Sequence, residues 1–141
     1  MSQLDERLEP AWRALKIGYG LVPLLAGLDK FFNLLTFWPK YVSPTAAAIL
    51  PIGPQQFMYA VGVIEIAVGV MILARWTTLG SYVAAAWLLG IAANLVLAGY
   101  FDVAVRDVAL AVGAFTLARL TEVRGSSEIR SSHPVAIKHA A

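Results

Sequence analysis

The stretch that decides the fold is IGYGLVPLLAGLDKFFNLLTFW, residues 17–38. Its apolar residues indicate a membrane-spanning helix, but the charged neighbours Asp29 and Lys30 interrupt the apolar run. A charged side chain at the centre of a bilayer costs about 2.5–3.5 kcal/mol on insertion scales, so such residues are rare and usually paired or functional. The rest of the chain therefore has to supply groups that meet this pair.

The composition is that of an integral membrane protein. Of the 141 residues, 59% are hydrophobic and 14% are charged, whereas soluble domains average about 45–50% apolar and about 25% charged residues. The length accommodates four spans of about 20 residues each and no separate soluble domain. The net charge of +2 is spread along the chain, which excludes a nucleic-acid-binding surface, and the absence of cysteine excludes thiol relays and disulfides.

Four apolar segments predict the spans, at residues 11–35, 57–74, 79–98 and 103–120. Pro23 lies inside the first segment and predicts a kink there. Short turns join the last three segments, which makes them antiparallel neighbours. We therefore expect an all-α membrane four-helix bundle in residues 1–120, followed by a flexible polar cytoplasmic tail in residues 121–141.

The connection between the first two spans, residues 36–56, is unusually long for a small bundle. Within it, Ser43 followed by Pro44 is typical of a helix N-cap and first helical position. This pattern predicts a short interfacial helix over residues 45–50, outside the membrane.

The distribution of basic residues predicts the orientation. If both termini are cytoplasmic, that side carries eight Lys and Arg residues: Arg7, Arg13, Lys16, Arg75, Arg119, Arg124, Arg130 and Lys138. The opposite side then carries three: Lys30, Lys40 and Arg106. We therefore expect cytoplasmic termini and an outer connection at residues 36–56.

Polar residues gather in the outer half of the predicted bundle, and all four helices contribute. Glu65 lies eight residues after Phe57, which places it about 12 Å deep at about 1.5 Å per residue. The inner half is almost entirely hydrocarbon. The residues of the predicted ligand-binding pocket are Asp29, Lys30, Glu65, Asn94, Arg106 and Asp107.

The second span carries Gly62, Glu65 and Gly69 on one helical face, because their spacings are three and four residues. Small residues allow a neighbouring backbone to approach, so this face is expected to point into the bundle. A buried Glu65 then needs a cation, and Arg106 or Lys30 is expected to lie within side-chain reach.

Each polar residue also has a purely structural interpretation. Asp102 fits an N-cap of the fourth helix or an i,i+4 partner of Arg106. Lys30 is long enough to extend to the outer headgroups. Asn94 fits an interhelical hydrogen bond, and Glu65 with Arg106 fits a structural ion pair.

No catalytic residue and no metal site are assigned. The sequence contains no nucleophile–base pair and no nucleotide-binding loop, so autonomous catalysis is not expected. His133 and His139 lie in the predicted tail without further ligand residues nearby.

Three segments of the chain resemble the DoxX family of small four-helix bacterial membrane proteins. They are GLVPLLAGLDKFFNL (residues 20–34), GVIEIAVGVMIL (residues 62–73) and NLVLAGYFDVAVRDVALAVGAFTLARL (residues 94–120). The resemblance covers the four predicted helices and not the tails. Its most specific elements are Gly-x-x-Lys at the end of the first helix, a Glu between glycines, and Arg-Asp at the start of the last helix.

The resemblance implies a multi-pass protein of the bacterial inner membrane that is linked to membrane redox chemistry. One relative is the membrane subunit of a thiosulfate:quinone oxidoreductase, and others accompany soluble redox enzymes. Related bundles that handle thiols carry cysteine pairs, and this chain has none, so thiol chemistry does not transfer. The resemblance implies a partner redox protein or larger membrane complex, with quinone as the candidate non-covalent cofactor.

Three functions remain open from the sequence. The first is a quinone-associated or small-ligand-binding accessory subunit of a membrane oxidoreductase system, with a head group between Glu65 and Arg106. The second is a non-catalytic scaffold or assembly subunit whose polar residues only specify helix packing, within an oligomer or a larger complex. The third, a small transporter or proton path, needs polar groups across the full membrane thickness, and the inner half lacks them.

Overall fold

The computed structural model describes residues 3–132, and all regular structure among these residues is helical. The elements in chain order are α1 Gln3–Asp29, the 3-10 helix η1 Trp38–Tyr41, α2 Pro44–Ile49, α3 Pro54–Leu73, α4 Thr77–Leu97 and α5 Phe101–Ser132. The predicted all-α fold class is confirmed. Two of the helices, α3 and α4, are long and apolar enough to cross a membrane.

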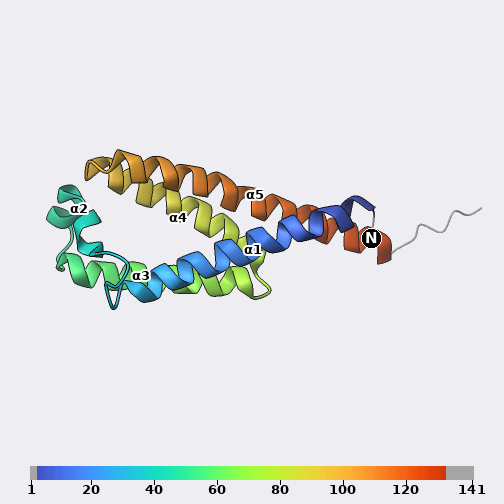
Figure 1. Ribbon diagram of the computed structural model, residues 1–141, viewed down its shortest axis with the longest axis horizontal. Coiled ribbons are helices and arrows are strands. Elements are labelled where there is room, and N and C mark those ends of the chain that lie inside the picture. The colour runs from blue at the N-terminus through green and yellow to red at the C-terminus, as the bar shows by residue number, and fades with distance from the viewer. Residues whose placement is uncertain (1–2, 133–141) are drawn as a thin grey trace, which may run out of the picture.

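Figure 1 shows the four long helices as two antiparallel pairs, α1 with α3 and α4 with α5, and the most extensive contacts lie within these pairs. The pairs come together at one end and diverge toward the other, where α2 lies between them (Figure 1). We call the end that carries α2 the loop end. The opposite end, toward which the N-terminus of α1 and the C-terminus of α5 extend, is the terminal end.

Glycines bring α1 and α3 into close contact. A Cβ atom added at Gly62 would lie 2.6 Å from the carbonyl oxygen of Gly27, and one at Gly69 would lie 2.6 Å from that of Gly20. The seven-residue spacing within each helix keeps both glycines on one face. The expectation that Gly62, Glu65 and Gly69 face into the protein is confirmed, since all three are buried.

The main hydrophobic core lies toward the terminal end, where all four long helices meet. It contains Val68, Ile72, Ala84, Ala85, Ala114 and Leu117, with Trp12, Leu15, Tyr19 and Leu88 packed against it. Gly80 of α4 lies against α3, because a Cβ there would be 2.9 Å from the Ile72 side chain and 3.0 Å from its backbone nitrogen. The Tyr19 hydroxyl of α1 lies directly over Gly113 of α5. A smaller cluster of Ala92, Leu95 and Ala104 lies between α4 and α5 near the loop end.

The short helix α2 confirms the predicted short helix in this connection and its cap. Ser43 is the N-cap residue, and its side-chain oxygen accepts a hydrogen bond from the Ala46 N–H at 3.1 Å. Pro44 occupies the first helical position, as the sequence predicts.

The ends of the first and fourth predicted spans differ from the expectation. The first span was expected to reach residue 35, but α1 ends at Asp29 and the chain turns through Asn33, whose φ angle is 54°. The predicted tail is helical as far as Ser132, because α5 packs along α1. Trp12 Nε1 donates to Thr121 at 2.8 Å. His133 and His139 lie outside the described residues.

The close contact between α1 and α3 leads to a stability prediction. We expect Gly62→Ala to destabilise the protein by about 1–3 kcal/mol, because an overpacked contact forces the backbones apart. Gly90→Ala is the matched control: nothing lies within 4 Å of that position, and replacing a helical glycine there should add about 0.5–1 kcal/mol. Thermal unfolding in mild detergent measures both variants, and equal melting temperatures would contradict the glycine contact.

Candidate functional site

Lys30 and Glu65 form a buried ion pair. The Lys30 Nζ donates to Glu65 Oε2 at 2.6 Å, and the two side chains are only 4% and 10% exposed. The same ammonium group lies 3.7 Å from the centre of the Trp38 ring, which adds a cation–π contact. The prediction that Glu65 lies within reach of Arg106 or Lys30 is confirmed through Lys30. The ammonium group is therefore directed at Glu65 in the interior and not outward from the helices.

Arg106 is not part of this pair, so the alternative interpretation of a structural Glu65–Arg106 ion pair is wrong. Its side chain is 73% exposed and lies 3.8 Å from Asp102, one turn earlier on α5. Asp102 lies inside the first turn of α5, so it pairs with Arg106 rather than capping the helix. The physical reason is helical rotation, which turns successive residues by about 100°. When Asp107 shares the inward face, Arg106 points away from it.

Asp29 organises the chain after α1. Its carboxylate accepts hydrogen bonds from the Leu34 and Leu35 backbone N–H groups, both at 3.0 Å, and from Trp38 Nε1 at 2.8 Å. Three donors satisfy the charge of a side chain that is only 7% exposed. Asp29 thus holds the loop and the Trp38 ring that covers Lys30, and it is a structural member of the predicted pocket.

Asn94 holds the connection between α1 and α3 against α4. Its Nδ2 donates to the Tyr41 carbonyl oxygen at 2.8 Å, and its Oδ1 accepts from the Ser43 N–H at 3.1 Å. The ring of Tyr41 also meets Tyr100 edge-on at 4.9 Å between centroids. Asn94 therefore makes the expected hydrogen bonds, and its partners belong to the connection between α1 and α3. Residues 36–53, which we call the strap, join the two helix pairs at the loop end.

Asp107 lies on the buried face of α5, between Ala104 and Ala111. Its carboxylate interacts electrostatically with Lys30 and with Glu65. Within residues 3–132 it has no hydrogen bond and no direct salt bridge. Asp107 is thus a half-buried acceptor close to an ion pair that is already complete.

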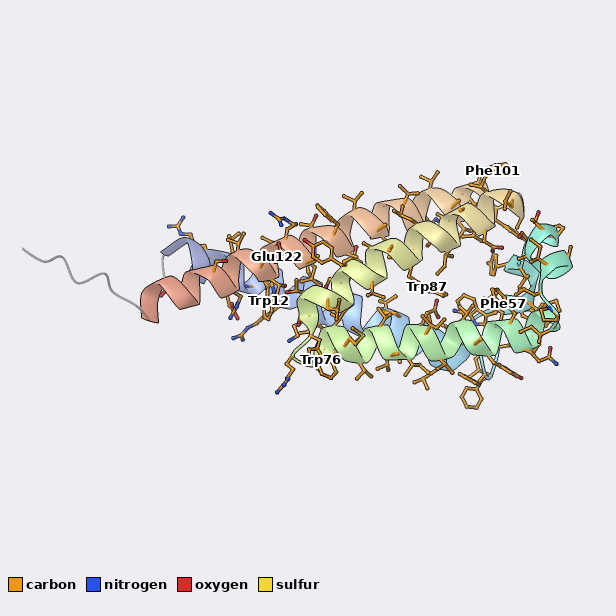
Figure 2. All side chains as sticks on the ribbon, turned by 180° about the vertical axis from the view of Figure 1, so that it is seen from behind. Trp12, Phe57, Trp76, Trp87, Phe101 and Glu122 are labelled. Atoms are coloured by element: carbon orange, nitrogen blue, oxygen red, sulfur yellow. The ribbon has the colours of Figure 1, made fainter. Side chains whose placement is uncertain are left out.

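Trp87 is a further member of the site that sequence reasoning missed. Ile72 of α3 touches Gly80 of α4. Glu65 precedes Ile72 on α3 by seven residues, and Trp87 follows Gly80 on α4 by seven residues. Because the two helices are antiparallel, both steps lead toward the loop end, so Glu65 and Trp87 occupy facing positions at similar depth. Figure 2 shows Trp87 between α4 and α3. Its Nε1 is buried and has no hydrogen-bond partner in the described part of the chain.

The sequence contains a signal for Trp87. Gly80, Trp87 and Asn94 are spaced by seven residues, and a heptad spacing keeps them near one face of a helix. A tryptophan between a close-packing glycine and a hydrogen-bonding asparagine indicates an inward indole.

We call Lys30, Glu65, Trp87 and Asp107 the interhelical cluster. It draws on the end of α1 and on α3, α4 and α5, and it contains one base and two acids. One carboxylate satisfies the ammonium, which leaves the second carboxylate and an indole N–H without partners among the described residues. No three His, Cys, Asp or Glu side chains in this part of the chain are arranged to hold a metal ion. The cluster is therefore equipped to hydrogen-bond a polar group.

Comparison of the chain with known protein families, with curated proteins and with solved structures finds no match. The DoxX resemblance therefore stays a prediction from the sequence.

The buried ion pair leads to a second stability prediction. Glu65→Gln leaves the Lys30 ammonium buried without its charged partner, and such a change typically costs about 3–5 kcal/mol. We expect the double variant Lys30→Met/Glu65→Met to recover most of that loss, since apolar replacement of a buried pair is often neutral or stabilising. Chemical unfolding in detergent measures both, and a single variant as stable as the wild type would contradict the buried pair.

Proposed function

We propose that this chain is a multi-pass protein of the bacterial inner membrane, with four spans and cytoplasmic termini. The apolar helices α3 and α4 support this proposal, as does the eight-to-three distribution of Lys and Arg. Large apolar side chains also project outward from α1 and α5, among them Val22, Val105 and Val112. A groove of about 360 Å³ on the outer surface of α4 and α5 is lined by Leu89, Val96 and other apolar side chains. Lipid hydrocarbon is the solvent that such a surface suits.

The topology has a direct test in this cysteine-free chain. Ile49 of α2 is 76% exposed, and Ser126 near the end of α5 is also exposed. We expect Ile49→Cys, and not Ser126→Cys, to react with a membrane-impermeant maleimide added to spheroplasts. The Ser43 side chain is unsuitable because it is buried as the α2 cap. Labelling of Ser126→Cys from outside would reverse the proposed orientation.

The function that the geometry supports best is binding of a small molecule with a polar head and an apolar body. The observation that carries this proposal is the surplus of polar groups in the interhelical cluster. A cluster that only fixed helix packing would need no more than Lys30 and Glu65. Asp107 interacts electrostatically with both, Trp87 occupies the facing position on α4, and neither the Asp107 carboxylate nor the Trp87 N–H has a hydrogen-bond partner in residues 3–132. Leaving the buried Trp87 N–H unpaired costs about 1–3 kcal/mol, so a ligand that supplies an acceptor to it binds favourably.

We further propose that this molecule is quinone-like and that the chain serves a partner oxidoreductase. The redox part of the proposal rests on the DoxX resemblance. Because Arg106 points away, we place the proposed head group near Trp87, Asp107 and the Lys30–Glu65 pair instead of between Glu65 and Arg106.

The alternative is a non-catalytic membrane scaffold, and specific contacts favour it. The hydrogen bonds of Asp29 and Asn94 are spent on the loop, and the Lys30–Glu65 pair ties the end of α1 to α3. A structural role therefore explains why these polar residues lie at the loop end, without a ligand.

The double variant Lys30→Met/Glu65→Met separates the two functions. It removes the ion pair that neighbours Asp107 while leaving no unpaired lysine in the interior. Wild type and variant are purified in mild detergent, and the copurifying small molecules and proteins are identified by mass spectrometry. We expect an amphipathic molecule to accompany the wild type and to be depleted from a folded double variant. A variant that keeps its partner proteins and the same small molecules as the wild type would decide for the scaffold.

A further inference from the structure

We propose that Trp87 and Asp107 are the residues that contact the ligand, and that the Lys30–Glu65 pair positions them. This inference rests on the proposed binding function. The ligand class that follows is an amphipathic molecule whose head carries a hydrogen-bond-accepting oxygen together with a hydroxyl donor, as an alkylated phenol or hydroquinone does.

Trp87 carries an indole N–H donor that no group in residues 3–132 accepts, and neighbouring contacts fix its position. The contact of Ile72 with Gly80 closes α3 onto α4 on the terminal side. Asn94, one heptad beyond Trp87, is occupied by the strap on the loop side. Trp87 lies between these two fixed points, and an indole nitrogen is a donor only. Its natural complement is an acceptor such as a carbonyl or phenolic oxygen.

The other tryptophans show what a satisfied indole looks like in this protein. Trp12 Nε1 donates to the Thr121 hydroxyl at 2.8 Å, and Trp38 Nε1 donates to Asp29 at 2.8 Å. Trp76, at the start of α4, is 55% exposed and lies in the turn between α3 and α4. Trp87 alone among the four combines a buried N–H with the lack of an acceptor in residues 3–132.

The Asp107 carboxylate is an acceptor that no donor in residues 3–132 uses. Lys30 directs its hydrogen bond to Glu65 and not to Asp107. The electrostatic attraction of the ammonium nevertheless acts on the Asp107 carboxylate, while Glu65 repels it. A hydroxyl group on a ligand is the donor that satisfies this carboxylate without adding charge to an apolar interior, and a charge-assisted bond is about twice as strong as a neutral one.

The Lys30–Glu65 pair acts as a positioning element because its two charges neutralise each other. The pair is closed at 2.6 Å, and the Trp38 ring covers the ammonium on another side. It fixes the end of α1 against α3 beside the facing position of Trp87. Its charge also sets the electrostatic environment of Asp107.

The test uses the full chain in detergent micelles with two probes, decyl-benzoquinone and decyl-hydroquinone. The benzoquinone head offers acceptors only, whereas the hydroquinone head offers acceptors and donors. With ¹⁵N-labelled tryptophan the protein gives one indole N–H signal for each of its four tryptophans, assigned by single Trp→Phe variants. We expect both probes to shift the Trp87 signal and to leave the Trp12 and Trp38 signals in place.

Affinities measured by titration separate the two contacts. Trp87→Phe should weaken both probes about five- to tenfold, as the loss of one hydrogen bond implies. Asp107→Asn should weaken the hydroquinone by about tenfold and change benzoquinone affinity less than about twofold, because only the hydroquinone has a donor. Trp76→Phe and Asp102→Asn are the matched controls on the same two helices and should leave both affinities unchanged. The remaining indole signals report whether each variant is folded.

The outcomes separate this inference from the function it rests on. Binding of the probes without a shift of the Trp87 signal, or with unchanged affinities in Trp87→Phe and Asp107→Asn, overturns the assignment of the contacts and leaves the binding function standing. Equal loss of both probes in Asp107→Asn overturns the hydroxyl-specific role of Asp107. Failure of the wild-type protein to bind either probe overturns both proposals.

Discussion

The rest of the loop end depends on the ion pair between Lys30 and Glu65. Each charge alone would cost several kcal/mol to remove from water, and together at 2.6 Å they are tolerated in an apolar interior. The pair lies where α1 ends and the chain turns into the strap, so it also fixes the direction of the chain. Glycines at Gly27 and Gly62 make the contact geometrically accessible, because they allow the two backbones to come within reach of a lysine side chain.

The two helix pairs are held differently at their two ends, and this difference creates the candidate site. At the terminal end, alanines, Ile72, Leu117 and Gly80 give dry, close packing that brings all four helices together. Toward the loop end the pairs diverge (Figure 1), and hydrogen bonds from Asn94 and Asp29 hold the strap that joins them. The terminal end is thus joined by packing, and the loop end by hydrogen bonds through the strap.

A binding function and a scaffold function give different roles to the polar residues of the predicted pocket. Asp29 and Asn94 are saturated by loop contacts, which identifies them as structural members of the predicted pocket. Arg106 is removed from the pocket by its outward orientation. Within the interhelical cluster, Asp107 and Trp87 retain hydrogen-bonding capacity that no group in the described residues uses. Asp107 and Trp87 are therefore the residues that favour a ligand, whereas the ion pair itself serves either function.

The sequence by itself determined the all-α class, the apolar helices α3 and α4, the capped helix α2 and the inward face of Glu65, because composition, helical periodicity and capping are local properties. It also placed charged residues from different helices at one depth, since depth follows from position along a helix. Only the tertiary structure decided which cation Glu65 meets, that α1 ends at Asp29, and that the Trp87 N–H has no acceptor in residues 3–132. These depend on the rotation of each helix and on the glycine contacts that set helix separation, and a turn of about 100° exchanges Arg106 for Asp107.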